Sequence, residues 1–216
     1  MTCREIVNPN HRPIQVELNR YHSLHQEGRN LISTWFQRAL EKQHCQMYEA
    51  FEPFIFTWFA FNGWAACVTD NDQDRKIINA LAADTQINSD FEQVICNNTD
   101  VRQSIYNFFD LLPIFDVKSL RRRRILRNTT ESRRELVNYY LSRGANCFEP
   151  GCWQRHFNEQ EPVPVDWGHF IKAIYKVRCN LFHGLKDANS EMDQSIVHSS
   201  YLALVQFLNE VHYLNA

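Results

Sequence analysis

The sequence predicts an all-α protein, and three observations carry this prediction. Almost every segment places apolar residues at helical spacing, and no run alternates strictly between apolar and polar residues. Residues that cap and end helices recur at the segment boundaries. The composition, with 44% hydrophobic and 13% aromatic residues, is that of a globular chain. A length of 216 residues suits one sizeable domain, which we expect to span residues 1–216.

Two helices are expected in the first third of the chain. Residues 13–44 place Leu24, Leu31, Trp35 and Ala39 at helical spacing, with Gly28 as the weak point. Pro53 suits the first turn of a second helix, since its missing N–H costs little there.

The second helix is apolar on nearly all sides, so we expect it to be central, with its Trp and Phe residues in the core. Its single polar interior residue, Asn62, is interpreted as a buried hydrogen-bonding group. Residues 70–72, Asp-Asn-Asp, are expected to end this helix.

Shorter helices are expected in the middle of the chain. Residues 75–83 and 101–112 have helical periodicity, and Pro113 ends the second of these segments. Residues 132–143 begin with the capping pattern Ser132-x-x-Glu135 and stop at Gly144. Residues 145–165 hold three prolines and one glycine, so they are expected to form the longest loop.

The last two helices have the clearest boundaries. Asp166 is a good N-cap for a helix that Gly184 is placed to close in a left-handed conformation. Ser190 can cap the final helix, whose apolar residues follow heptad-like spacing. The apolar side of the penultimate helix consists of Phe170, Ile171, Ile174, Tyr175 and Val177.

Charge is distributed unevenly although the formal net charge is only -2. Residues 49–116 carry eleven acids and three bases, whereas residues 118–143 carry nine bases and two acids. The basic residues Arg121, Arg122, Arg123, Arg124 and Arg127 are candidates for binding an RNA backbone. A solvated face neutralised by the preceding acidic region explains the same residues equally well, because four consecutive arginines point all around a helix.

The seven cysteines indicate reduced thiols. Their number is odd and no export signal opens the chain, so we expect a cytoplasmic protein. No membrane partner is expected, because the longest apolar stretch, residues 51–68, is short and contains polar residues. Cys147, Cys152 and His156 offer three zinc ligands, but their spacing is wide and no fourth ligand lies nearby in the sequence. Unpaired thiols are the favoured interpretation, and we expect no metal or other cofactor.

Arg178, Asn180 and His183, near the end of the penultimate helix, are the candidate catalytic residues. The guanidinium offers several donors for a phosphate, and an imidazole can exchange protons near neutral pH. Arg178 and His183 are five residues apart, so an ideal helix separates them by about 140°. His183 directly precedes Gly184, however, in the fraying last turn, where side-chain directions are less constrained. The alternative is structural, with Arg178 paired to an acid on a neighbouring helix and His183 satisfying terminal carbonyls.

The segment Val-Arg-Cys-Asn-Leu-Phe-His-Gly, residues 177–184, resembles the Arg-x4–6-His signature of HEPN (higher eukaryotes and prokaryotes nucleotide-binding) domains. The aromatic helix with its single Asn is similar to one found in some members. The resemblance covers residues 14–68 and 166–214, and it implies a HEPN-like helical bundle. Residues 70–160 are interpreted as a central helical insertion that includes the basic segment 118–143.

The resemblance implies a metal-independent endoribonuclease in which two subunits bring their motifs together, so we expect a homodimer that acts on RNA. A toxin or anti-phage defence effector is the expected role, with an antitoxin, a regulatory protein or an activating ligand as its control. The alternative is a catalytically inactive HEPN module for dimerisation or for RNA or nucleotide binding. Cys179 favours the alternative slightly, because many active members have a polar residue directly after the arginine.

Overall fold

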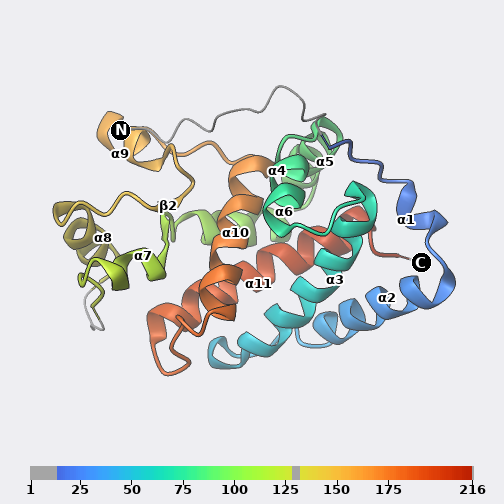
Figure 1. The fold of residues 1–216 in the computed structure, drawn as a ribbon, viewed down its shortest axis with the longest axis horizontal. Helices are drawn as coiled ribbons and strands as arrows, with labels where there is room; N and C mark the ends of the chain where they lie inside the picture. Colours follow the sequence, from blue (N-terminus) through green and yellow to red (C-terminus); the bar gives the residue numbers. More distant parts are fainter. Residues whose placement is uncertain (1–13, 128–131, 216) are drawn as a thin grey trace.

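The computed structural model describes residues 14–127 and 132–215, and these form an all-α protein, as predicted. Figure 1 shows the helices packed as a bundle. The described residues also form one pair of very short strands. The helices are α1 (Arg20–Ser23), α2 (Gln26–Leu40), α3 (Phe51–Thr69), α4 (Asp74–Ala82), α5 (Thr85–Asn97), α6 (Thr99–Phe109), α7 (Val117–Arg122), α8 (Arg133–Ser142), α9 (Trp153–Glu159), α10 (Trp167–Phe182) and α11 (Glu191–Val211). A 3-10 turn, Met47–Glu49, precedes α3, and the strands are β1 (Ile114–Phe115) and β2 (Phe148–Glu149).

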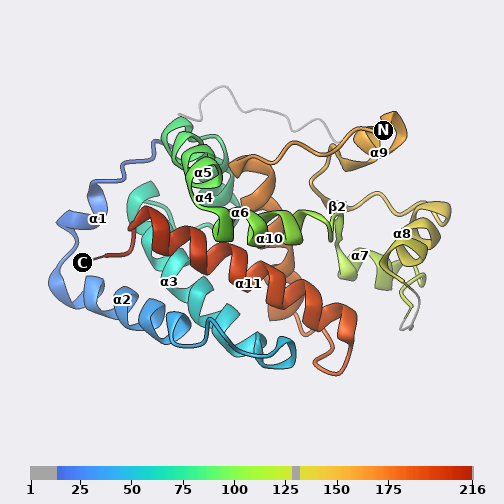
Figure 2. The same cartoon turned by 180° about the vertical axis from the view of Figure 1, so that it is seen from behind.

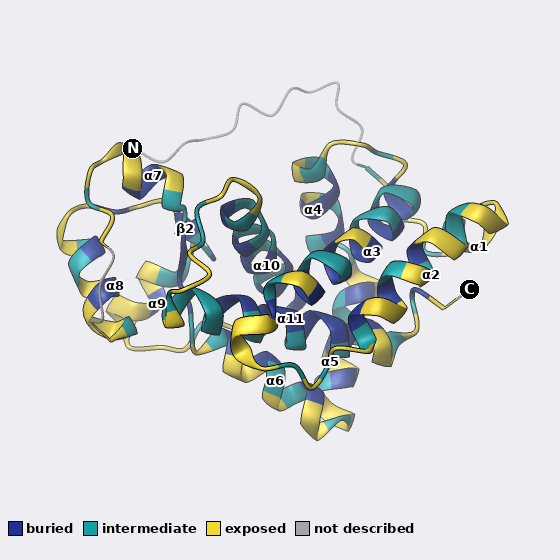
Figure 3. Ribbon diagram, turned by 90° about the horizontal axis from the view of Figure 1, so that it is seen from below, coloured by how far each residue is buried: buried dark blue, intermediate teal, exposed yellow. Residues whose placement is uncertain are grey.

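Helices α3, α10 and α11 form the centre of the bundle, and α2 and α4–α6 surround them (Figures 1 and 2). The buried residues in Figure 3 concentrate on the inner faces of these helices. Two buried side-chain hydrogen bonds join helices of the bundle. The Tyr201 hydroxyl of α11 donates to the Ala39 carbonyl of α2 at 2.6 Å, and the Trp167 indole of α10 donates to the Leu81 carbonyl of α4 at 2.8 Å. Because α4, α5 and α6 contribute to the same core, much of segment 70–160 belongs to the bundle itself.

A second, smaller core lies on the side of α10 away from α1 and α2 (Figures 1 and 2). Strands β1 and β2 pair antiparallel there, with Phe115 opposite Phe148. Helices α7 and α8 pack their apolar residues against this pair, including Leu120, Leu136 and Tyr140. This small core joins the basic segment to α10 through β1.

Helix boundaries follow the predicted caps closely. Ser132 and Glu135 form both bonds of a capping box at the start of α8, and Ser190 caps α11 by accepting from the Asp193 N–H. Asp70 ends α3 in the left-handed conformation, and Gly144 follows α8 with φ 75°. The local signals for these ends are therefore confirmed.

Three predictions need correction. Residues 145–165 are not a plain loop, because they contain β2 and α9. Helix α5 was not predicted as a separate element, although Asp84 caps it by accepting from the Ile87 N–H. Asn62 is only half-buried and makes no side-chain hydrogen bond within the described residues, so its predicted role as a buried hydrogen-bonding group is wrong.

The prediction that the Trp and Phe residues of α3 form the core is confirmed for Phe54, Trp58, Phe61 and Trp64, which are almost fully buried, but it is wrong for Phe59, which is 39% exposed. Across residues 14–127 and 132–215, no helix is both long and apolar enough to cross a membrane.

Candidate active site

Helix α10 holds the candidate catalytic residues at its C-terminal end. The helix ends in two backbone bonds: the Gly184 N–H donates to the Leu181 carbonyl, and the Leu185 N–H donates to the Asn180 carbonyl, each at 2.9 Å. Gly184 has φ 64°, a conformation that glycine adopts without strain. His183 is the C-cap, so its side chain leaves the helix where the chain turns away.

Arg178 is held against neighbouring helices. Its Nη2 atom forms an ion pair with Asp74 at the start of α4, at 3.0 Å. The guanidinium carbon lies 4.7 Å from the centre of the Phe182 ring and 5.5 Å from that of Trp58. The buried Nε atom has no hydrogen-bond partner in the part of the chain that the structure describes. Arg178 is thus paired with an acid on a neighbouring helix, as the structural alternative predicted. Its Nε–H group remains an unsatisfied donor within the described residues.

Asn180 is buried, and its amide is already used. Its Nδ2 group donates to the Phe115 carbonyl at 2.8 Å, and its Oδ1 atom accepts from the Val117 N–H at 3.1 Å. Both partners belong to the β1–α7 segment, so Asn180 fastens that segment to α10. These contacts give Asn180 a structural role in addition to its predicted catalytic one.

Replacing Asn180 by alanine is expected to destabilise the protein by about 2–3 kcal/mol, because two backbone groups near the core lose their only side-chain partner. The measurement is the free energy of unfolding in urea. Asn79→Ala is the matched control, since Asn79 is an exposed asparagine in α4. A loss below about 0.5 kcal/mol would contradict the structural role.

His183 is exposed and lines a cavity of about 680 Å³ beside α10. Within the described residues its imidazole makes no hydrogen bond or ion pair. Four basic and two acidic residues also line the cavity. The basic residues are Arg75, Lys118, Lys172 and Lys176, and the acidic residues are Asp116 and Glu149.

The cavity keeps an excess of positive charge. Lys176 is paired with Asp116 at 3.0 Å, and burial raises the pKa of Glu149, which favours its neutral form. Lys172 and Lys176 are one turn apart on α10, and His183 follows seven residues after Lys176, so all three share one side of the helix. Sequence reasoning missed the two lysines, although this spacing was a usable signal.

Arg178 and His183 lie on different sides of α10. Arg178 lies in the regular part of the helix, whereas His183 is its C-cap and has non-helical backbone angles. The cavity beside His183 is lined by other basic residues, whereas Arg178 faces Asp74 and the aromatic rings. Within one subunit the two motif residues therefore do not meet at a single point.

The predicted RNA-binding arginines lie around a different cavity or on the open surface. Arg121, Arg122, Arg123 and Arg124 are all exposed, and Arg123 donates to the Gly144 carbonyl and to Asn146. The Arg127 guanidinium lies 3.7 Å from the centre of the Tyr139 ring. These side chains do not form one continuous row, because α7 ends at Arg122.

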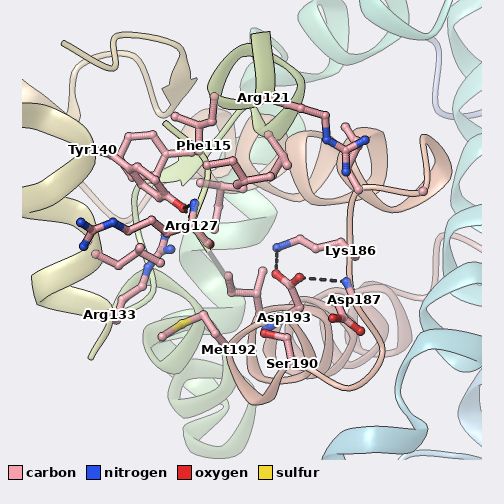
Figure 4. A pocket seen from close by; sticks show the side chains of 18 of the residues that line it. Phe115, Arg121, Arg127, Arg133, Tyr140, Lys186, Asp187, Ser190, Met192 and Asp193 are labelled. Carbon is pink, nitrogen blue, oxygen red and sulfur yellow. Dashed lines mark hydrogen bonds and ion pairs between the residues drawn. The ribbon is translucent and has the colours of Figure 1, made fainter. Parts of the chain in front are cut away.

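Arg121 and Arg127 line a cavity of about 570 Å³ between α7, α8 and the start of α11 (Figure 4). Lys186 and Asp193 face each other in its wall, at 2.5 Å between Nζ and Oδ1. The Lys186 side chain is only 4% exposed, and burial lowers its pKa. Arg133 donates to the Leu111 and Pro113 carbonyls, and burial lowers its pKa to about 10.

The candidate zinc ligands are not brought together. His156 lies near Glu161, at 3.9 Å, whereas the Cys152 thiol lies beside His169. Cys147 is exposed and contacts Asn146. The cysteines of the described residues are free thiols.

Fold and site together define an all-α protein with a positively charged cavity beside the C-terminal end of α10. No protein-family model, curated protein or solved structure matches the chain.

Proposed function

We propose that this protein is a metal-independent endoribonuclease that acts as a homodimer, with Arg178 and His183 of both subunits around one cleavage site. The observation that carries the proposal is the position of His183. An exposed imidazole that has no partner among residues 14–127 and 132–215 lies at a cavity whose basic residues can hold phosphates. The resemblance of residues 177–184 to the HEPN signature supplies the reaction.

The reaction is an attack of the ribose 2′-OH on the adjacent phosphorus. One imidazole takes the proton of the 2′-OH, the new O–P bond forms, and the bond to the 5′-oxygen breaks. A second imidazole, protonated, gives its proton to the departing 5′-oxygen. Arg178 stabilises the negative charge that develops on the phosphoryl oxygens. The products carry a 2′,3′-cyclic phosphate and a 5′-OH.

Two subunits are needed because each chain supplies a single histidine of the motif, His183, and directs Arg178 elsewhere. Phe182 lies between the two residues along α10 and is 41% exposed. A two-fold axis near Phe182 would bring the His183 imidazoles of the two chains together, with Arg178 of each chain flanking them.

An apolar surface patch supports this axis. It crosses α2, α3 and α10 and consists of the exposed Leu31, Phe59 and Phe182 and the half-buried Trp35. The Phe59 ring contacts both Trp35 and Phe182, and Leu31 is 60% exposed one turn before Trp35. Exposed apolar surface of this kind is typical of a protein interface.

Leu31→Glu and Phe59→Glu are each expected to weaken dimerisation at least about tenfold, because a charge would be buried in the interface. Cleavage should fall in parallel, with thermal stability little changed. Sedimentation velocity over a concentration series measures the association. Tyr106→Glu is the matched control, since Tyr106 is an exposed aromatic residue on α6. Full cleavage by a monomeric variant would contradict the dimeric site.

The activity itself is tested by incubating the purified protein with mixed RNA in excess EDTA. Cleavage that persists, with cyclic phosphate ends on the products, supports the enzyme. RNA binding without cleavage supports the second candidate, a catalytically inactive RNA-binding module; the ion pair that holds Arg178 favours it. We further propose that a toxin or anti-phage role requires an antitoxin, a regulatory protein or an activating ligand, since unrestrained cleavage would harm the host.

A further inference from the structure

Three side chains at the other end of the α10 cavity form a hydrogen-bonded series that RNA cleavage does not use. The Cys152 Sγ atom lies 3.2 Å from His169 Nε2, and His169 Nδ1 lies 2.7 Å from Asp166 Oδ2. Cys152 directly precedes α9, Asp166 is the N-cap of α10, and His169 is in the first turn of α10. A nucleophile, a base and a group that orients the base thus come from two separate segments.

Asp166 fixes the state of the imidazole. Its Oδ1 atom accepts from the His169 backbone N–H at 2.8 Å while Oδ2 contacts the ring. Burial raises the pKa of Asp166, but hydrogen bonds from His169 outweigh it, so the net pKa is lowered and the carboxylate is ionised. An ionised carboxylate can only accept, so Nδ1 carries the proton and Nε2 is left to accept from the thiol.

The thiol needs this base. Burial raises the pKa of Cys152, so it is protonated at neutral pH and becomes a nucleophile when its proton passes to His169. Cys152 and His169 both line the cavity, so the sulfur can be reached from it. The wall beside the sulfur is open, because a Cβ atom added at Gly151 would meet no heavy atom within 4 Å.

The charge of the cavity selects the substrate class. Lys172 follows His169 by one turn of α10, and Lys176 follows by a second turn. Both line the same cavity as the thiol. An ester whose acyl part ends in a carboxylate could therefore place its carbonyl carbon at Cys152 while the lysines hold its negative charge.

We infer that Cys152, His169 and Asp166 form a second catalytic site, a thiol esterase site for small acyl esters that carry a negative charge. The thiol proton moves to Nε2 as the sulfur bonds to the acyl carbon. The bond to the alcohol oxygen breaks, and the imidazolium returns the proton to that oxygen. Water, deprotonated by Nε2, then cleaves the thioester, releases the acid and restores the thiol.

The test is the hydrolysis of mono(4-nitrophenyl) succinate compared with neutral 4-nitrophenyl acetate, using the full chain. We expect a burst of nitrophenol followed by turnover, with the anionic ester preferred at least about tenfold. Cys152→Ser should remove the burst, and His169→Ala should slow it about 10²-fold. Cys147→Ser is the matched control, because Cys147 is an exposed thiol in the same segment. The inference would be overturned if the wild-type protein hydrolysed the anionic ester no faster than Cys152→Ser does.

Thiol labelling gives a second readout that does not depend on turnover. Iodoacetate should modify Cys152 faster in the wild-type protein than in His169→Ala, while Cys147 and Cys96 are labelled equally in both, as measured by peptide mass spectrometry. Equal labelling of Cys152 in the two proteins would also overturn the proposal. Because neither measurement involves RNA, a failure here leaves the proposed ribonuclease unaffected, and a failure of RNA cleavage leaves this site unaffected.

Asp166 acts through His169 and is a positioning residue. Asp166→Asn keeps an oxygen for the helix cap but removes the charge that holds the proton on Nδ1. We expect slower labelling of Cys152 and a changed tautomer signal of His169 in ¹⁵N NMR, with the unfolding temperature preserved. An unchanged tautomer together with an unchanged labelling rate would show that Asp166 only caps α10.

Discussion

Replacing His183 by alanine is expected to reduce RNA cleavage about 10²–10⁴-fold while leaving the fold intact, because the variant removes a proton donor and acceptor from both halves of the proposed site. The side chain is exposed and makes no hydrogen bond within the described residues, so its loss should change stability by less than about 0.5 kcal/mol. The measurements are initial cleavage rates in EDTA and a thermal unfolding curve. His22→Ala is the matched control, since His22 is an exposed histidine on α1.

Mixed dimers sharpen this prediction. When wild-type and His183→Ala subunits are combined in equal amounts and allowed to exchange, about half of the dimers contain one of each. A site that needs both imidazoles works only in wild-type dimers, so about one quarter of the activity should remain. Two independent sites would leave about one half. Unchanged cleavage by the pure variant would contradict any catalytic role of His183.

The fold could be predicted because its boundaries depend on local chemistry. Asp166 and Ser190 supply oxygens to the N–H groups of the helices that follow them, and Gly184 supplies the left-handed turn that closes α10. Each of these signals involves residues within one or two turns of each other, so a single sequence reveals it.

The parts that could not be predicted depend on distant segments. Asn180 has no local feature that marks it as buried; its partners are backbone groups of residues 115 and 117, more than 60 positions earlier. Cys152 and His169 are 17 residues apart and meet because β2 and α9 fold the supposed loop back onto α10. The two-residue strands are too short to produce a periodic pattern.

Asp193→Ala is expected to destabilise the protein by about 3–5 kcal/mol, the largest stability effect proposed for this chain. Asp193 Oδ1 holds the Lys186 ammonium, whose side chain is only 4% exposed, and Oδ2 accepts from the Asp187 N–H at 2.9 Å. Without the carboxylate, a buried positive charge has no counterion and the turn between α10 and α11 loses its anchor. Urea unfolding at neutral pH measures the change.

The pH dependence identifies the buried ammonium as the cause. Burial lowers the pKa of Lys186 in the folded state, and Asp193 opposes this shift. Removing Asp193 therefore lowers the pKa of Lys186 in the folded state further. The unfolded state then binds more protons than the folded state over a wider pH range below the ordinary lysine pKa of about 10.4. Stability rises with pH where the unfolded state binds more protons. The deficit of Asp193→Ala should consequently shrink as the pH is raised from neutral towards about 9.5.

Two variants separate charge burial from simple loss of a helix-cap carboxylate. Glu191→Ala removes an exposed acid from the same turn of α11 and should cost less than about 1 kcal/mol. Adding Lys186→Met to Asp193→Ala removes the unpaired charge and should recover most of the lost stability, because an apolar side chain tolerates this burial. If the double variant is no more stable than Asp193→Ala at neutral pH, the buried ammonium is not the source of the loss, and the turn hydrogen bond to Asp187 is.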